Sequence, residues 1–189
     1  KVSPHVNRII FCATFAGMKP TDSDITIRRV LPEDACQIAD IYNYYVRETT
    51  VSFEVAVLSV EDMRGRIERI LGEYPYFVAE RGGEILGYCY AHEWKERPAY
   101  RRTFENTVYL RHGLTSHGVG RRLMETLIDA CRDVGCHALI ACITTENEGS
   151  RRFHRALGFR EVSHFSEVGY KLGRYLDVTD MELLLGQPE

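Results

Sequence analysis

The apolar positions of this 189-residue chain follow two different periods, and each period marks a different kind of element. Stretches that alternate in polarity, or that are apolar throughout over a few residues, are typical of β-strands. They predict strands over residues 24–30, 76–80, 84–94, 104–111, 137–143, 159–169 and 174–185. A Gly-Gly pair between the second and third of these favours a tight hairpin.

Between the strands, apolar residues recur every three or four positions, as on the buried face of a helix. Four helices are expected: one that begins at Pro32, one over 59–71, one over 119–134 and one over 147–158. Ser59 and Asp62 have the spacing of a capping box at the start of the second helix. The residues predicted to face inward are Ala35, Ile38, Tyr42, Tyr45, Met63, Ile67, Ile70, Leu71, Val119, Leu123, Leu127, Cys131, Val134, Phe153 and Leu157.

The resulting order, β-α-α-β-β-β-α-β-α-β-β, predicts an α/β (α+β) fold in which helices cover a mixed sheet. The length suits one domain, which we place at residues 23–186. Residues 1–22 lie outside it and are interpreted as an extension or a start-site artefact. Their short apolar run after a basic stretch resembles a secretion signal only faintly.

Composition narrows the classes of function. A net charge of −3 gives no general reason to expect nucleic acid or an anionic membrane as a partner. No apolar run approaches the ~20 residues of a membrane span. Six scattered cysteines form no C-x-x-C pair and share no zinc-ligand spacing with the histidines, so we expect no metal. Reduced thiols in a cytoplasmic protein are the simplest interpretation.

One turn carries a chemical signal. The sequence "LTSHGVGRRLMETLIDA", residues 114–130, places Gly118 and Gly120 where a strand gives way to a helix, with Arg121 and Arg122 behind them. Unpaired N–H groups and partial positive charge at a helix start, approached through glycines, can hold a phosphate. The motif is neither a Walker loop nor a dinucleotide fingerprint. Taken alone, it also fits an ordinary strand-to-helix turn with solvated arginines.

Several motifs occur in register around this turn: "GEILGYCYAHEW", "ENTVYL", "HGVGRRLMETLIDA" and "NEGSRRFHRALGF". Over residues 24–185 the chain resembles the GNAT superfamily of acyl-CoA N-acyltransferases. "RPAYRRTFENTVYL" and "EVGYKLGRYLDVTDMEL" are similar to its phosphinothricin and methionine sulfoximine acetyltransferase branch. The chain differs at Thr115, where the family has Gln or Arg, and at Tyr175, where the branch has Trp.

The resemblance implies a centrally splayed sheet and acetyl-CoA as co-substrate. The fourth strand would carry a bulge and diverge from the fifth, so that pantetheine pairs with it, and a backbone N–H near Leu110 would bind the oxyanion. The pyrophosphate would lie on the amides from Ser116 to Arg121. The residues implied to contact the cofactor are Val108, Tyr109, Leu110, Ser116, His117, Gly118, Val119, Gly120, Arg121, Asn147 and Ser150.

Acetyl transfer to an amine needs a base, and the resemblance places Glu105 in that role. His154 falls where many relatives carry a tyrosine that protonates the leaving thiolate. It could act as that acid or simply line the cofactor channel. Asn147 and Ser150 could equally serve as N-cap and first-turn residues of their helix.

On the acceptor side, the branch implies a small amino-acid-like amine such as phosphinothricin or methionine sulfoximine. Arg101 would clamp its carboxylate, and Phe53, Trp94 and Tyr100 would form the walls. The segment around Tyr175 would help to form a homodimer. Two alternatives remain: a protein, peptide or polyamine N-acetyltransferase of the same fold, and a non-catalytic module that binds acyl-CoA.

Overall fold

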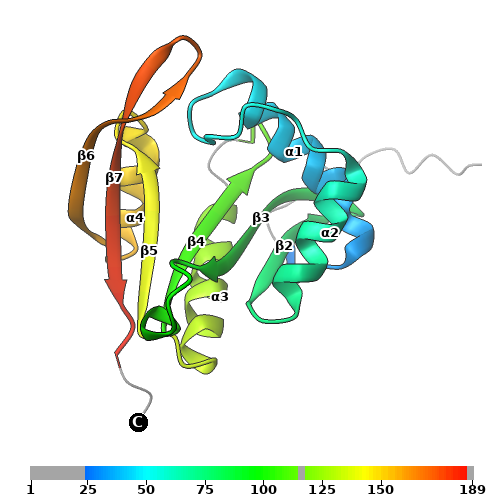
Figure 1. Ribbon diagram of the computed structural model, residues 1–189. Coiled ribbons are helices and arrows are strands. Elements are labelled where there is room, and N and C mark those ends of the chain that lie inside the picture. The colour runs from blue at the N-terminus through cyan, green and yellow to red at the C-terminus, as the bar shows by residue number, and fades with distance from the viewer. Residues whose placement is uncertain (1–23, 115–117, 187–189) are drawn as a thin grey trace, which may run out of the picture.

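The computed structural model describes residues 24–114 and 118–186, and they form one mixed sheet with helices on both faces (Figure 1). The extension assigned to residues 1–22 lies outside this part of the chain. The elements are β1 Thr26–Arg29, α1 Ala35–Glu48, α2 Val60–Leu71, β2 Tyr76–Arg81, β3 Glu84–Glu93, β4 Thr103–Leu110, α3 Val119–Asp133, β5 Ala138–Thr144, α4 Glu148–Ala156, β6 Arg160–Lys171 and β7 Arg174–Leu184. This order confirms the predicted succession of strands and helices.

Local signals explain where the helices begin. Pro32 opens a short 3-10 turn, Pro32–Asp34, that leads into α1. The capping box at α2 is present: the Asp62 N–H donates to Ser59 Oγ at 3.0 Å, and the Ser59 N–H donates to the Asp62 carboxylate at 3.2 Å. A second short turn, Pro98–Tyr100, lies between β3 and β4, where no element was predicted.

The strands are ordered β1-β2-β3-β4-β5-β7-β6, and only β4 and β5 run parallel. α1 and α2 cover one face, with a core cluster that includes Ile38, Met63 and Tyr88. α3 packs on the other face over a second cluster that includes Leu123, Leu127 and Leu139. Two separate apolar clusters therefore pack against the two faces of the sheet.

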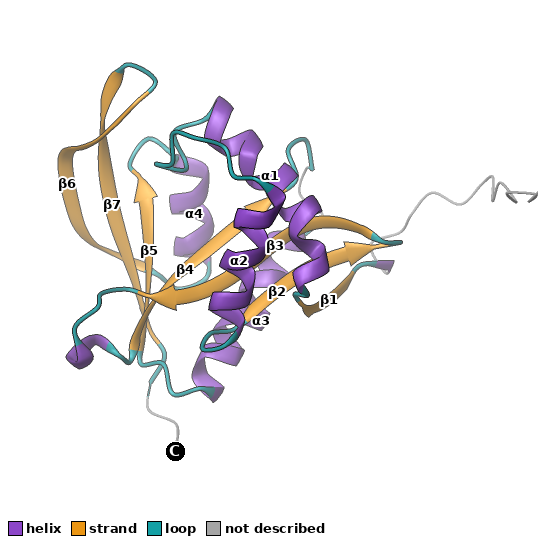
Figure 2. Cartoon of the chain, turned by 45° about the vertical axis from the view of Figure 1, so that its right-hand side comes forward, coloured by secondary structure: helices purple, strands orange, loops and turns teal. Residues whose placement is uncertain are grey.

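The sheet opens in its middle. β4 and β5 pair only at Thr103–Ala138, Phe104–Leu139 and Glu105–Ile140, and beyond Glu105 the two strands diverge (Figures 1 and 2). This confirms the expected splay. The expected bulge in β4 is wrong, because the register of β4 with β3 runs without a shift from Phe104 to Leu110. The gap therefore comes from the divergence of two regular strands.

Most residues predicted to face inward do so, with one clear error. Val134 is 54% exposed, because α3 ends at Asp133 and the chain turns away at Val134. α4 also has a feature that the pattern missed: its fully buried side chain is His154, whereas Phe153 and Leu157 are half-buried. No helix in the described part of the chain is long and apolar enough to cross a membrane.

Candidate active site

A cavity of about 910 Å³ occupies the gap between β4 and β5. Its walls come from α1, the loop that precedes α2, α2 itself, β3, β4 and the turn that follows it, the start of α3, β5, α4 and β7. Past Glu105, no described strand pairs with β4 on its β5 side, so backbone N–H groups along that edge are available to an extended ligand, whereas the Leu110 carbonyl oxygen accepts from the Tyr45 hydroxyl at 2.6 Å. The cavity thus has the unpaired strand edge that the expected pairing with a pantetheine arm requires.

Glu105 lies at the vertex of this gap, at the last paired position of β4 and β5. Its side chain is 27% exposed, and the nearest ionisable partner is His92 on β3, whose Nε2 lies 3.8 Å from the carboxylate. Burial, together with the negative charge of Asp180, raises the pKa of Glu105 to about 7. A carboxylate with this pKa can accept a proton near neutral pH, as a general base must.

Two neighbours of Glu105 stay uncharged. Burial lowers the pKa of His92, and the His92 Nδ1–H donates to the Glu93 carbonyl oxygen at 2.8 Å. The Cys142 thiol on β5 donates to Asp180 Oδ1 at 3.1 Å, and burial, followed by the carboxylates of Asp180 and Glu105, raises its pKa. The lowered pKa makes His92 a weaker base than Glu105, and the Cys142 thiol keeps its own proton at neutral pH.

The charge of Asp180 gives a prediction. Asp180→Asn removes a negative charge next to Glu105, so the pKa of Glu105 should fall. The acidic limb of the kcat/KM profile, expected near pH 7 in the parent, should move to lower pH in the variant. The control is Asp129→Asn on α3, which changes net charge equally but pairs with Arg132 on the far side of the sheet. If both variants keep the parental limb, Asp180 does not act on Glu105.

One end of the cavity lies at the start of α3, where the sequence predicts the pyrophosphate site. Gly118 is the N-cap of this helix and has φ +69°, a conformation that side chains other than glycine rarely adopt. Gly120 lies close to Leu110 and to the Phe153 ring, 3.5 and 3.6 Å from the position of an added Cβ. A smaller adjoining hollow of about 320 Å³ is lined by Gly118, Val119, Gly120, Arg121, Leu110, Leu114 and Phe153.

The two arginines of this turn differ in role. Arg121 pairs with Glu125 at 3.0 Å on the surface of α3, and its side chain remains half exposed next to the smaller hollow. Arg122 instead donates to the Ile25 carbonyl oxygen at 2.8 Å and ties α3 to the segment before β1. Only Arg121 therefore adds charge at the expected phosphate position. Ser116 and His117 lie outside the described residues.

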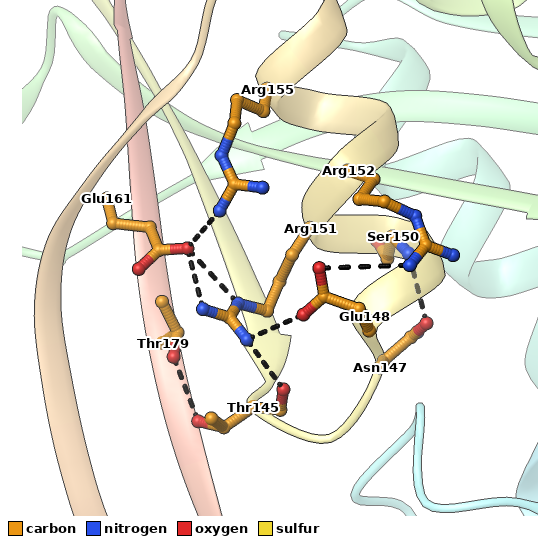
Figure 3. A network of polar contacts seen from close by, with 9 residues as sticks. All are labelled: Thr145, Asn147, Glu148, Ser150, Arg151, Arg152, Arg155, Glu161 and Thr179. Carbon is orange, nitrogen blue, oxygen red and sulfur yellow. Dashed lines mark hydrogen bonds and ion pairs between the residues drawn. The ribbon is translucent and has the colours of Figure 1, made fainter.

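α4 forms another wall of the main cavity, and a network of polar contacts holds this helix in place (Figure 3). Asn147 is its N-cap and accepts from the Ser150 N–H at 3.1 Å, as the simpler interpretation of these two residues predicted. Arg151 joins Glu148 of its own helix to Glu161 of β6, at 2.9 and 2.7 Å. The network fixes α4, and with it the side chain of His154, against β5 and β6.

The loop before α2 forms part of the cavity wall. Lys171 on β6 is 5% exposed and donates from Nζ to the Ser52 carbonyl oxygen at 2.6 Å. Gly169 packs so closely against the Phe53 ring that there is no room for a side chain at this position. These contacts connect the β6–β7 hairpin to the loop and place Phe53 at the cavity wall.

The structure gathers most of the predicted site residues and leaves three apart. Those that line the main cavity are Phe53, Glu105, Val108, Tyr109, Leu110, Gly120, Asn147, Ser150 and His154. Trp94, Tyr100 and Arg101 belong to the loop between β3 and β4, outside this lining. There Trp94 and Tyr100 pack edge to face at 5.2 Å, and Arg101 is exposed.

Several residues that line the cavity or contact Glu105 were missed by sequence reasoning. The hairpin register places His92 opposite Glu105 and Tyr90 opposite Thr107, so pairing β3 with β4 on paper could have found both. Arg66 of α2 also lines the cavity and binds Glu54 at 2.7 Å. No local sequence signal reveals it, because α2 is far from β4 along the chain.

Comparison with known proteins gives a consistent picture. Residues 27–179 match the family model described as "Acetyltransferase (GNAT) domain". A phosphinothricin N-acetyltransferase of Alcaligenes faecalis is 39% identical over 159 residues, which cover 83% of this chain and 81% of that protein. An L-methionine sulfoximine/L-methionine sulfone acetyltransferase of Salmonella typhimurium is 34% identical over 165 residues, 86% of this chain and 96% of its own.

A similar solved structure is that of a GNAT superfamily phosphinothricin acetyltransferase from Sinorhizobium meliloti in complex with acetyl-CoA. It superimposes with a TM-score of 0.82 at 33% identity and covers 86% of this chain and 89% of that one. At 33% identity the two chains share sequence as well as fold.

Proposed function

The chain belongs to the GNAT family of acetyl-CoA-dependent N-acetyltransferases, and we propose that it acetylates the α-amine of a small amino-acid-like acceptor, using Glu105 as general base. The observation that carries this proposal is the position of Glu105 at the vertex of the β4–β5 gap, with a pKa of about 7. The names of the two relatives above support phosphinothricin and methionine sulfoximine or sulfone as the acceptor class.

The proposed reaction is direct transfer. Glu105 takes a proton from the acceptor ammonium, directly or through a water molecule, and the freed lone pair attacks the thioester carbonyl. Backbone N–H groups along the open edge of β4 near Leu110 would hold the developing oxyanion. The C–S bond then breaks to release the CoA thiolate, and the amide nitrogen loses its second proton to the thiolate or to solvent water. The amides of Gly118 to Arg121 would bind the pyrophosphate, with Val108, Asn147 and Ser150 along the pantetheine arm.

The test is release of free thiol from acetyl-CoA. The full chain is assayed with phosphinothricin, methionine sulfoximine and methionine sulfone, and beside them with a polyamine and a basic peptide. Turnover confined to the first three would support the proposed acceptor class. Turnover on the polyamine or the peptide alone would replace that class while keeping the family. Binding of acetyl-CoA without turnover on any amine would favour a non-catalytic module.

For the acceptor carboxylate we propose Arg101, because its guanidinium is exposed on the loop that leaves β3 two residues after His92. Trp94 and Tyr100 of the same loop, together with Phe53, would complete the walls. Arg66 is the alternative within the cavity, but its guanidinium is already bound to Glu54.

Arg101→Met is therefore expected to raise KM for an amino-acid acceptor and to leave KM for acetyl-CoA unchanged. Hydrogen bonds to a charged group contribute about 1.5–3 kcal/mol, or roughly a 10- to 150-fold rise in KM. Steady-state kinetics of Arg66→Met, measured in parallel, is the control. A larger rise in KM in that variant than in Arg101→Met would transfer the clamp to Arg66.

We also propose that the chain forms a homodimer through the β6–β7 hairpin. The hairpin projects past the helices (Figure 2) and exposes Val162, Phe165, Val168, Tyr170, Leu172 and Tyr175, each between 48% and 63%. Apolar side chains gathered on one element mark an interaction surface more often than scattered ones do.

The expected particle in light scattering has twice the 21.7 kDa mass of the chain. Joint replacement of Tyr170 and Tyr175 by lysine should give a particle of 21.7 kDa, because charge would be buried at the proposed interface. Val134→Lys alters an equally exposed apolar residue at the end of α3 and should leave the mass unchanged. A monomeric parent protein would refute the proposal.

A further inference from the structure

His154 is bound on both sides of its ring. Nδ1 lies 2.9 Å from the Ser150 carbonyl oxygen, one turn back on α4, and Nε2 lies 3.1 Å from Asn106 Nδ2 on β4. The ring is 2% exposed and packs edge to face against Phe159 at 5.1 Å. It has no freedom to reorient without losing one of these bonds.

These contacts decide where the ring proton is. A carbonyl oxygen can only accept, so Nδ1 carries the proton and donates to the Ser150 carbonyl oxygen. The Ser150 hydroxyl oxygen, 3.3 Å from Nδ1, is then a second and longer acceptor of the same N–H. In the neutral ring Nε2 then has a lone pair, which accepts from the Asn106 amide N–H. The surroundings favour the neutral form: the groups around the ring are Asn106, Ser150, Phe153 and Phe159, and Glu105, the next residue on β4, faces the opposite side of the sheet. Burial lowers the pKa of His154 in the same direction.

Asn106 has a second notable feature. It is 6% exposed and lines the cavity, and its Oδ1 has no hydrogen-bond partner among the described residues. An amide could rotate to present Oδ1 to Nε2, but Nε2 would then need a proton of its own, and the ring would be charged. With Nδ1 protonated, the neutral ring requires the Asn106 N–H to face Nε2, and this orientation leaves Oδ1 without a partner among the described residues.

We propose that Asn106 is a positioning residue that holds His154 as the neutral, Nδ1-protonated ring with Nε2 acting as an acceptor, so that the ring lines the thioester channel and does not donate a proton from Nε2. This rests on the proposed function only in placing the thioester in that channel. It resolves the choice between acid and channel lining that the sequence left open. It also assigns a role to a residue that neither the motif nor the glutamate mechanism uses.

The test is ring ¹⁵N NMR of the full chain labelled at histidine, with the His154 signals assigned by comparison with His154→Gln. At pH 7 the parent should show a protonated Nδ1 and an unprotonated Nε2. Asn106→Leu, which keeps the size of the side chain but removes the donor, should shift Nε2 towards the position of a nitrogen without a hydrogen bond. Asn106→Asp presents only acceptor oxygens and should raise the titration midpoint of His154 by about 1–3 pH units.

A protonated Nε2 in the parent at pH 7 would overturn the proposal, and so would an Asn106→Asp variant whose His154 signals match the parental ones. Kinetics adds an independent readout. The alkaline limb of the kcat profile should be the same in His154→Gln as in the parent, whereas loss of that limb would show that the ring is the acid. The NMR result does not depend on turnover, so it stands even if the proposed acceptor class is wrong.

Discussion

Glu105→Gln is expected to lower the rate of acetyl transfer by about 10²–10⁴-fold, which is the contribution of a positioned general base. The same substitution is expected to make the protein more stable above pH 7. The amide keeps the size of the side chain but cannot take the ammonium proton. Binding of acetyl-CoA should be unchanged, because Glu105 lies at the vertex of the gap and the proposed cofactor wall is formed by β4 beyond it and by α3 and α4.

The gain in stability follows from the direction of the pKa shift. The pKa of Glu105 is raised from 4.5 to about 7, so the folded protein holds this proton more tightly than the unfolded chain does. Below pH 4.5 the carboxyl is neutral in both states and parent and variant should be equally stable. Between pH 4.5 and 7 the parent loses stability relative to the variant, and above pH 7 the difference is constant, with a ceiling of about 3 kcal/mol at 1.36 kcal/mol per pKa unit.

Denaturant unfolding at pH 5, 6 and 8, combined with thiol release at pH 8, measures both effects. Glu93→Gln, at the exposed end of β3, is the control and should change the free energy of unfolding by less than about 0.5 kcal/mol. A stability gain that does not vary with pH would show that burial of charge is not its cause. Retained transfer in Glu105→Gln would move the base elsewhere, and His92 would then be the first candidate.

The fold was largely predictable because each element carries its own local signal. The capping box at Ser59, the apolar run of β5 and the glycines around α3 are readable within a few residues. Errors occurred where a local pattern continued past the point at which tertiary structure ended it. Val134 continues the apolar stripe of α3, yet it lies beyond the last helical residue and faces solvent.

The site was predictable only along β4 and the two helix starts, where family motifs name the residues. The environment of Glu105 depends on Asp180 of β7 and on the hairpin partner His92, which come together only when the sheet is assembled. The same is true of Asn106 on β4 and His154 on α4, which are 48 residues apart in the sequence and form a hydrogen bond only in the folded chain. A linear motif records which residues are present but not which of them share a hydrogen bond.

Gly87→Ala is expected to destabilise the fold and to weaken cofactor binding together. Gly87 on β3 is buried opposite Leu110 of β4. A Cβ at this position would lie 2.5 Å from Leu110 Cδ2 and 2.7 Å from the Tyr109 carbonyl oxygen. The Leu110 side chain could rotate away, but the Tyr109 carbonyl is backbone, so β4 itself must move.

Overpacking of this kind costs about 1–3 kcal/mol, and in a chain of this size each kcal/mol lowers Tm by about 2–4 °C. The shift falls on the stretch of β4 that offers its edge to pantetheine, so the Kd for acetyl-CoA should also rise. Calorimetry and isothermal titration measure the two effects. Gly65→Ala is the matched control: Gly65 is exposed in the middle of α2 with nothing within 4 Å of an added Cβ. There the same methyl group should stabilise the helix by about 0.4–1 kcal/mol, because it reduces the freedom of the unfolded chain.

Opposite signs of the stability change at Gly87 and Gly65 would show that the close approach of β3 and β4 causes the destabilisation. A neutral or stabilising effect of Gly87→Ala would contradict the prediction, because β3 and β4 would then have room for a side chain opposite Leu110.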